Sequence, residues 1–139
     1  MRDSLKTLGR IKKFELDEQQ RLLVVELERE EALTKELANL IETYEKEKAF
    51  VAENPGICDF GLYTDQYLKK RREKEKQIDA TRQKIDAIRD VMSDIFKEQK
   101  TYEIVDDNRR KRRQKEIDAL EQKMLDEIGT DAYIKRHQE

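Results

Sequence analysis

Apolar side chains recur every seven residues along most of the chain, with companions three positions further on. Between residues 16 and 51, seven of eleven such positions are apolar. The sevenfold series contains Leu16, Leu23, Glu30, Leu37, Tyr44 and Val51, and its companions are Gln19, Glu26, Leu33, Leu40 and Glu47. An imperfect heptad of this kind is typical of a helix that packs one face against another helix. The pattern predicts a helix over about residues 4–52.

A second periodic segment follows. Its sevenfold positions are Ile78, Ile85, Met92 and Gln99, with companions Thr81, Ile88, Ile95 and Tyr102. Residues 106–116 contain no apolar side chain, and the stripe then resumes with Ile117, Leu120, Met124, Leu125 and Ile128. The pattern predicts a helix over about residues 62–128. Gly129 followed by Thr130 and Asp131 is typical of a helix end and a new N-cap, which indicates a short terminal helix over about 130–137.

The segment between the two helices, residues 53–61, holds the only proline and two of the four glycines of the chain. Proline disfavours the helical conformation of the residue before it, so Asn54-Pro55-Gly56 predicts a turn. The expected fold is all-α. It is a single unit over residues 1–139, an antiparallel coiled-coil hairpin whose second helix is longer and overhangs the first.

Composition agrees with a narrow seam between helices. Hydrophobic residues make up 36% of the chain, charged residues 45%, and the mean hydropathy is −1.04. This leaves too little apolar surface for a broad core. Residues 14–53 carry twelve acidic and five basic residues, whereas residues 62–115 carry eleven acidic and seventeen basic ones. Opposite net charges favour antiparallel pairing of the two segments, although each exposed pair contributes less than about 1 kcal/mol.

Folding at the hinge brings together positions whose numbers sum to about 114, which places Leu5 opposite Arg109 and Leu37 near Gln77 and Ile78. Residues beyond about 111 then lack a partner within the chain. The basic residues of 1–13 approach the basic run at 109–115, which holds six bases in seven residues. Such crowding of like charge favours an acidic partner. A solvated helical face, with a frayed end in the free protein, is the alternative.

Phe60, Tyr63 and Tyr67 lie near the hinge, followed by a second basic run at residues 69–76. Tyr63 and Tyr67 are four residues apart and share a helix face. They are expected either to close the hairpin as a small hydrophobic plug or to form a docking patch.

The sequence offers little catalytic chemistry. The glycines are too scattered for a phosphate loop, and His137 is the only histidine. We therefore expect no enzyme activity, no cofactor and no metal site. Cys58 cannot form an internal disulfide, and we interpret it as an unpaired thiol in a reducing cytoplasm. No apolar run reaches the ~18–20 residues that cross a bilayer, and the N-terminus lacks a signal-peptide core, so no membrane insertion is expected.

Three segments carry a resemblance to a known family. They are Phe96-x-x-x-Lys100-x-x-Glu103, the basic run at 109–115, and the segment from Glu121 to Ile128. With the helix–hinge–helix plan, they make nearly the whole chain resemble the FliJ family, the coiled-coil components of the bacterial flagellar type III export apparatus. None of the three is a catalytic signature.

The resemblance implies a hairpin similar to the central shaft of rotary ATPases, at the cytoplasmic face of the flagellar base. It also implies three partners: the export ATPase hexamer, the cytoplasmic domain of the membrane export gate protein, and export chaperones. The ring-facing candidates are Arg10, Lys13, Arg109, Arg112, Arg113, Leu120 and Met124. The gate-facing candidates are Tyr63, Tyr67 and Leu68. This chain has Arg71 where family members carry an apolar residue one turn after the aromatic, which is a departure from the gate-facing pattern.

Three other interpretations stay open. The chain could be the equivalent stalk of a virulence type III secretion system, or a nucleic-acid-binding coiled coil that uses the basic end. A pI near 5.7 and the acidic residues after Lys115 make nucleic acid the less expected partner. The third is a structural homodimer joined through two overhangs.

Overall fold

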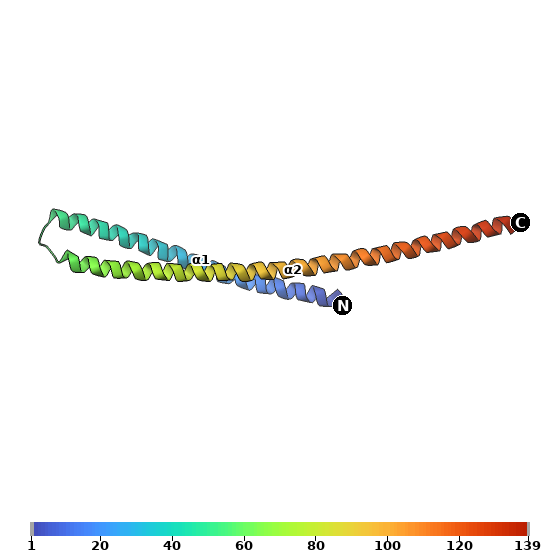
Figure 1. Cartoon of the computed structure of the whole chain (residues 1–139), viewed down its shortest axis with the longest axis horizontal. Coiled ribbons are helices and arrows are strands. Elements are labelled where there is room, and N and C mark those ends of the chain that lie inside the picture. The colour runs from blue at the N-terminus through green and yellow to red at the C-terminus, as the bar shows by residue number, and fades with distance from the viewer. Residues whose placement is uncertain (1, 139) are drawn as a thin grey trace. The chain divides into compact units, whose positions relative to one another are not determined.

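The computed structural model describes residues 2–138, which form two helices and no strand: α1 (Arg2–Glu53) and α2 (Phe60–Gln138) (Figure 1). The two helices pack against each other in antiparallel directions. The predicted all-α helical hairpin is therefore confirmed. The helix bounds differ from the predicted ones mainly at the C-terminal end of α2.

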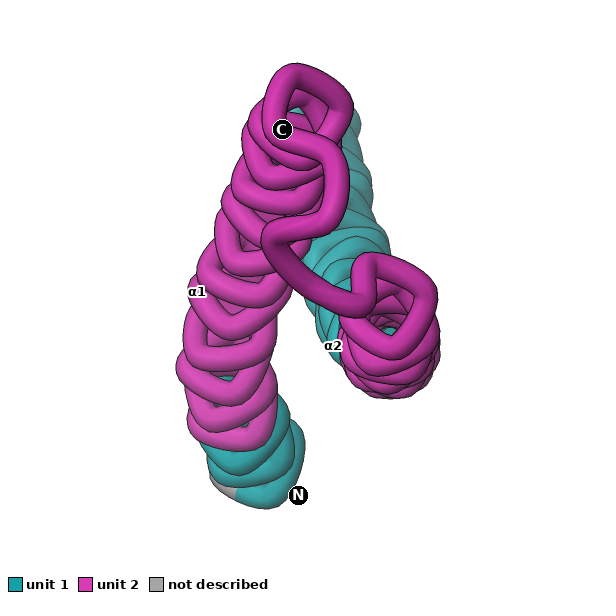
Figure 2. The backbone as a smooth tube through the Cα atoms, turned by 90° about the vertical axis from the view of Figure 1, so that its left-hand side faces the viewer, with its two compact units in different colours: residues 1–13, 96–139 teal, residues 14–95 magenta. Residues whose placement is uncertain are grey.

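The chain divides into two compact units, residues 14–95 and residues 1–13 with 96–139 (Figure 2). Residues 14–95 include the connection between the helices. The other unit combines the first turns of α1 with the C-terminal part of α2. Each unit therefore contains a stretch of both helices.

The connection between the helices occupies residues 54–59, inside the predicted hinge. The backbone N–H of Asn54 donates to the Phe50 carbonyl at 3.0 Å, and its side-chain amide donates to the same oxygen, also at 3.0 Å. Pro55 cannot continue the helix because it has no N–H to donate. Gly56 follows with a φ of +85°, a conformation that costs a residue with a Cβ about 1–2 kcal/mol.

Asp59 caps the N-terminus of the second helix. Its Oδ1 accepts a hydrogen bond from the Leu62 N–H at 3.3 Å, and its carbonyl accepts one from the Tyr63 N–H at 3.3 Å. This is the geometry of an N-cap, which satisfies backbone donors that have no partner in the first turn. The cap places the start of α2 at Phe60, two residues before the predicted Leu62. Cys58 lies just before the cap, and its thiol is free and exposed.

The seam of residues 14–95 follows the predicted heptad positions. Its buried side chains are Leu33, Tyr67, Ile78, Thr81 and Ile85, with Ile95 at the end of the segment. Other positions of the two series, such as Leu23 and Ile88, are half-buried. No side chain that the structure describes is completely excluded from solvent. The hydrophobic effect therefore acts along a narrow line of contacts, and the outward faces remain charged.

Ion pairs across the seam show which positions face each other. The Arg82 Nε donates to the Glu30 carboxylate at 3.3 Å, and the Lys74 ammonium contacts the Glu36 carboxylate. Opposed residue numbers therefore sum to about 111. The predicted sum of about 114 is wrong by close to one helical turn.

The shift in register follows from the closed end of the hairpin. The rings of Tyr44 and Tyr67 stack with centroids 3.9 Å apart and an interplanar angle of 4°. The Tyr44 and Thr64 hydroxyls also lie within hydrogen-bonding distance, at 3.2 Å. The early start of α2 at Phe60 brings Tyr67, rather than a residue one turn later, opposite Tyr44.

Two polar side chains occupy seam positions in residues 14–95. Thr81 is 2% exposed, and its hydroxyl donates to the Gln77 carbonyl one turn earlier at 2.8 Å. Glu26 is half-buried, and its Oε2 is a buried oxygen with no hydrogen-bond partner in the described chain. A buried acceptor without a donor costs about 1–3 kcal/mol.

The predicted helix end at Ile128 and the separate helix over 130–137 are wrong, because α2 continues without a break to Gln138. Gly129 does not have the positive φ of a helix C-cap. The Thr130 hydroxyl donates to the Asp126 carbonyl at 2.8 Å, so it bonds within the helix rather than capping a new one.

The conformations of two glycines predict opposite effects of alanine. Gly56→Ala should lower the free energy of unfolding by about 1–2 kcal/mol, because alanine is strained at positive φ. Gly129→Ala should instead increase the helicity of the C-terminal end, since alanine favours a helix by about 1 kcal/mol over glycine. Urea unfolding and hydrogen exchange of residues 126–134 measure the two effects. Reduced protection in Gly129→Ala would show that Gly129 is a cap.

Glu26 predicts a stabilising substitution. Glu26→Leu should raise the free energy of unfolding by about 1–3 kcal/mol, because it removes a buried, unpaired carboxylate oxygen and adds apolar contact. Glu28→Leu is the matched control, because Glu28 is exposed and should give a change within about 0.5 kcal/mol. Equal effects of the two changes in urea unfolding would contradict a cost specific to Glu26.

Candidate functional site

The C-terminal part of α2 is uncovered. In the unit that contains it, α1 runs beside α2 as far as Asp106, which is the last half-buried position of the helix. Every residue from 107 to 138 is exposed. We call residues 107–138 the overhang. The prediction that residues beyond about 111 have no partner in the chain is confirmed for the described residues, with the boundary about one turn earlier.

The overhang begins with the basic run at residues 109–115, which includes Arg109, Arg112 and Arg113. All six bases of the run are exposed. Arg110 pairs with Asp106 one turn earlier, at 3.0 Å. The other five bases form no ion pair with any side chain of residues 4–138. Their charge is therefore available to a partner.

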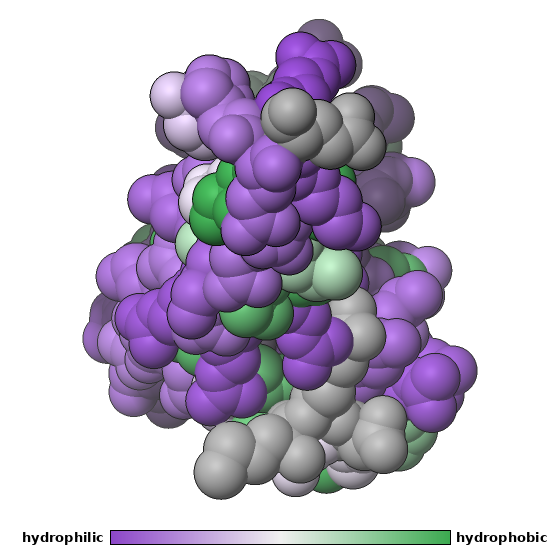
Figure 3. Space-filling model, turned by 90° about the vertical axis from the view of Figure 1, so that its right-hand side faces the viewer, coloured by the Kyte–Doolittle hydropathy of each residue, from purple (hydrophilic) through white to green (hydrophobic). Residues whose placement is uncertain are grey.

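A one-sided apolar stripe follows the basic run. Ile117, Leu120, Met124 and Ile128 are spaced by three or four residues and so share one helix face. Leu120, Met124 and Ile128 are 61–62% exposed. Hydrophilic residues cover most of the face drawn in Figure 3, with apolar residues visible between them. A stripe of this kind gains free energy when another surface covers it.

The expected crowding of like charge at the start of α1 is wrong for Lys6, Arg10, Lys12 and Lys13, whereas the side chain of Arg2 lies outside the described residues. The Lys12 ammonium pairs with Glu98 at 2.6 Å. Lys6, Arg10 and Lys13 line a groove with acidic residues of α2, Glu103 and Asp106. The first turns of α1 therefore face carboxylates, and the basic run at 109–115 lies beyond them.

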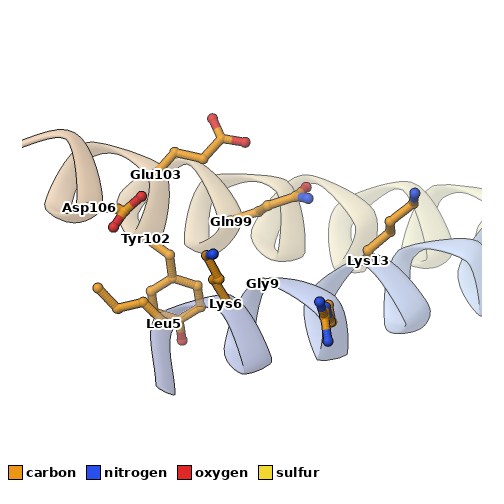
Figure 4. Close-up of a pocket in the computed structure, with 9 residues that line it drawn as sticks. Leu5, Lys6, Gly9, Lys13, Gln99, Tyr102, Glu103 and Asp106 are labelled. Carbon is orange, nitrogen blue, oxygen red and sulfur yellow. The ribbon is translucent and has the colours of Figure 1, made fainter. Parts of the chain in front are cut away.

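The groove also explains where Leu5 lies. Leu5 of α1 is beside the Tyr102 ring of α2, with Asp106 nearby, rather than opposite Arg109 (Figure 4). Gly9 forms part of the wall and leaves open space where a larger residue would put a side chain. Of the ring-facing candidates, Arg10 and Lys13 lie in this groove and are exposed.

At the hinge, the structure resolves the two readings of the aromatic residues in favour of a plug. Phe60, Tyr63 and Tyr67 surround the ring of Tyr44, at centroid distances of 5.6, 6.1 and 3.9 Å. Tyr67 is only 6% exposed. It therefore offers little surface to a partner, and the gate-facing candidates that remain accessible are Tyr63 and Leu68, at 36% and 37% exposure.

Arg71 completes the plug on its outer side. Its Nη1 donates to the Tyr67 hydroxyl at 3.3 Å, and its Nε pairs with Glu75 at 3.1 Å. The hydrogen bond to Glu75, followed by that to Tyr67, raises the pKa of Arg71. Arg71 thus has a structural role here, since it holds the tyrosine hydroxyl.

Sequence reasoning missed the acidic residues that face the start of α1, namely Glu98, Glu103 and Asp106. It paired all the α1 bases with 109–115, although positions whose numbers sum to about 114 place Arg10, Lys12 and Lys13 nearer to these acids than to the basic run. The sequence signal that could have found them is the spacing of Tyr44 and Tyr67 about the hinge.

The described residues contain no cluster of three or more His, Cys, Asp or Glu side chains that could hold a metal ion. Neither α1 nor α2, over the part described, is long and apolar enough to cross a bilayer. Comparison of the chain with protein-family models, curated proteins and solved structures found no match.

The plug predicts a large effect of Tyr67→Ala. The change removes a buried ring and its stacking on Tyr44, so it should lower the free energy of unfolding by about 2–4 kcal/mol. Urea unfolding measures this loss. Phe50→Ala, at a position 50% exposed, should lower it by less than about 1 kcal/mol. If the two substitutions lower the free energy of unfolding by the same amount, the plug does not stabilise the hairpin.

Proposed function

We propose that this chain is a non-enzymatic stalk or adaptor of the flagellar type III export apparatus, which binds the ring of the export ATPase through its overhang. The observation that carries the proposal is the exposed overhang, where a basic run, paired within the described chain only through Arg110 and Asp106, is followed by an apolar stripe. The partner would supply carboxylates for the first and apolar contacts for the second.

The remaining candidates fit this proposal to different degrees. Arg109, Arg112, Arg113, Leu120 and Met124 all lie in the overhang and are exposed. Arg10 and Lys13 would contribute at its base, where Glu103 and Asp106 partly offset their charge. The gate contact would involve Tyr63 and Leu68, since Tyr67 is buried. Export chaperones are further partners under the same proposal.

Charge reversal tests the ring contact. Arg109→Glu, Arg112→Glu and Arg113→Glu together should abolish stimulation of the export ATPase and weaken its binding by about tenfold or more. Helicity should stay unchanged, because the three side chains are exposed and form no ion pair with residues 4–138. The measurements are ATP hydrolysis with added protein and circular dichroism.

The control carries the same change of charge elsewhere on α2. Lys69→Glu, Lys70→Glu and Arg72→Glu also reverse three exposed bases but lie near the hinge. This variant should stimulate the ATPase as the wild type does. If the overhang variant still stimulates the export ATPase fully, the proposal is wrong.

Nucleic acid is the second candidate partner, because the same exposed basic run could neutralise phosphates. That interaction would lose affinity steeply as salt rises. The acidic segment next to the run disfavours it, since residues 116–131 carry six acids and one base. A filter-binding assay with single-stranded and duplex DNA at near-physiological salt separates the two candidates. The equivalent stalk of a virulence secretion system would use the same contact with its own ATPase.

A further inference from the structure

We propose that two copies of this chain associate through their overhangs, which pack antiparallel about a twofold axis near Leu120. The inference goes beyond the proposed function and does not depend on it, because it needs no molecule other than the chain itself. It follows from the distribution of charge on the two sides of the apolar stripe.

Charge on the overhang is divided evenly about Leu120. Residues 107–119 carry six bases and three acids, a net charge of +3. Residues 121–133 carry four acids and one base, a net charge of −3. Antiparallel packing sets the positive half of each copy against the negative half of the other, whereas parallel packing sets like charges against each other along the whole contact. The charges therefore favour the antiparallel orientation.

The charged side chains beside the stripe also match in position. Four of them share the direction of Leu120 around the helix axis to within about 20°, because successive residues of a helix are rotated by about 100°. They are Arg109, Arg113, Glu127 and Asp131. Since Leu120 faces the Leu120 of the other copy, opposed residue numbers sum to about 240. This places Arg109 opposite Asp131 of the other copy, and Arg113 opposite Glu127.

These four charged groups are available for the contact. All four side chains are exposed, and none of them forms an ion pair with any side chain of residues 4–138. In a twofold interface each contact occurs twice, so the two kinds of pair give four ion pairs in all. The complementarity is therefore between groups that the single chain leaves unpaired.

The apolar stripe supplies the centre of the interface. Leu120 packs on its own copy, and Ile117 comes level with Met124 of the other chain. Leu120 and Met124 are 62% and 61% exposed in the single chain, so covering them removes apolar surface from water. Because α1 runs beside α2 only as far as Asp106, residues 107–133 are free to overlap in this arrangement.

Sedimentation equilibrium of the purified full chain tests the association. With a reductant present to keep Cys58 as a thiol, the average mass should rise with concentration from 16.7 kDa toward that of a dimer. Added salt should raise the dissociation constant, because it screens exposed charges. A mass of 16.7 kDa at every concentration, or association only without the reductant, would overturn the inference.

An exchange of charge tests the pairing. Arg109→Glu with Arg113→Glu should weaken self-association by about tenfold or more, because all four ion pairs become repulsive. Glu127→Arg with Asp131→Arg should weaken it in the same way. The chain with all four changes again has opposite charges across the contact, so its dissociation constant should return to within about threefold of the wild type. If that chain is helical by circular dichroism but monomeric, the pairing is wrong.

The matched control reverses two charges of the same basic run on its far side. Lys111 and Lys115 are exposed and lie about 180° and 140° from Leu120 around the helix. Lys111→Glu with Lys115→Glu should therefore weaken self-association by less than about threefold. A loss equal to that of the Arg109 and Arg113 variant would show general attraction between charges rather than the proposed interface.

A second matched pair tests the position of the axis. Leu120 and Leu125 are both 62% exposed, but Leu125 lies about 140° from Leu120 around the helix. Leu120→Ala should weaken self-association by about tenfold, because the axis brings two copies of this residue together. Leu125→Ala should change it by less than about threefold. Equal losses would contradict an axis near Leu120.

The outcomes separate the inference from the proposed function. A chain that stays monomeric and binds the export ATPase through its overhang would overturn the inference and leave the proposed function standing. A chain that dimerises as described and does not bind the ATPase would support the inference and contradict the proposed function.

Discussion

The contact between the rings of Tyr44 and Tyr67 fixes how far the two helices slide past each other, and the arrangement of charge depends on that register. Because the Tyr44 ring lies flat on Tyr67, opposed positions within residues 14–95 sum to about 111, as the pairs of Glu36 with Lys74 and Glu30 with Arg82 show. A shift of one turn would separate Glu30 from Arg82 and Glu36 from Lys74. One aromatic contact near the hinge thus sets which charged positions face each other in residues 14–95.

Polar residues in the seam lower the stability of the hairpin in places, but the ion pairs favour one alignment of the two helices. Its apolar contacts are few, and a uniformly apolar line would tolerate slippage by whole heptads. Glu30 and Glu36 pair with Arg82 and Lys74 in the observed register, so these pairs favour it even though each exposed pair stabilises little. Glu26 has no such pairing, and nothing in the described structure explains its presence in the seam.

Local patterns in the sequence predicted the features that depend on local physics. Heptad spacing identified the buried positions, and Pro55 with Gly56 identified the turn, because both follow from backbone geometry. The register could not be read in this way, since it depends on the length of the turn and on a ring contact across the hairpin. The predicted helix end at Gly129 was wrong because the Gly-Thr-Asp pattern does not show which hydrogen bond the Thr130 hydroxyl makes. That hydroxyl bonds within the helix. For the candidate site, the exposed overhang was predicted, and the burial of Tyr67 follows one of the two expectations for the aromatic residues near the hinge.

The exposed thiol of Cys58 has a practical consequence for work with the purified protein. It is the only cysteine of the chain and lies in the turn, just before the helix cap of α2. Without a reductant, two molecules could join there by air oxidation, and the product would imitate a natural dimer although the seam and the overhang took no part. The same thiol lets a maleimide dye be attached at one known point without any mutation.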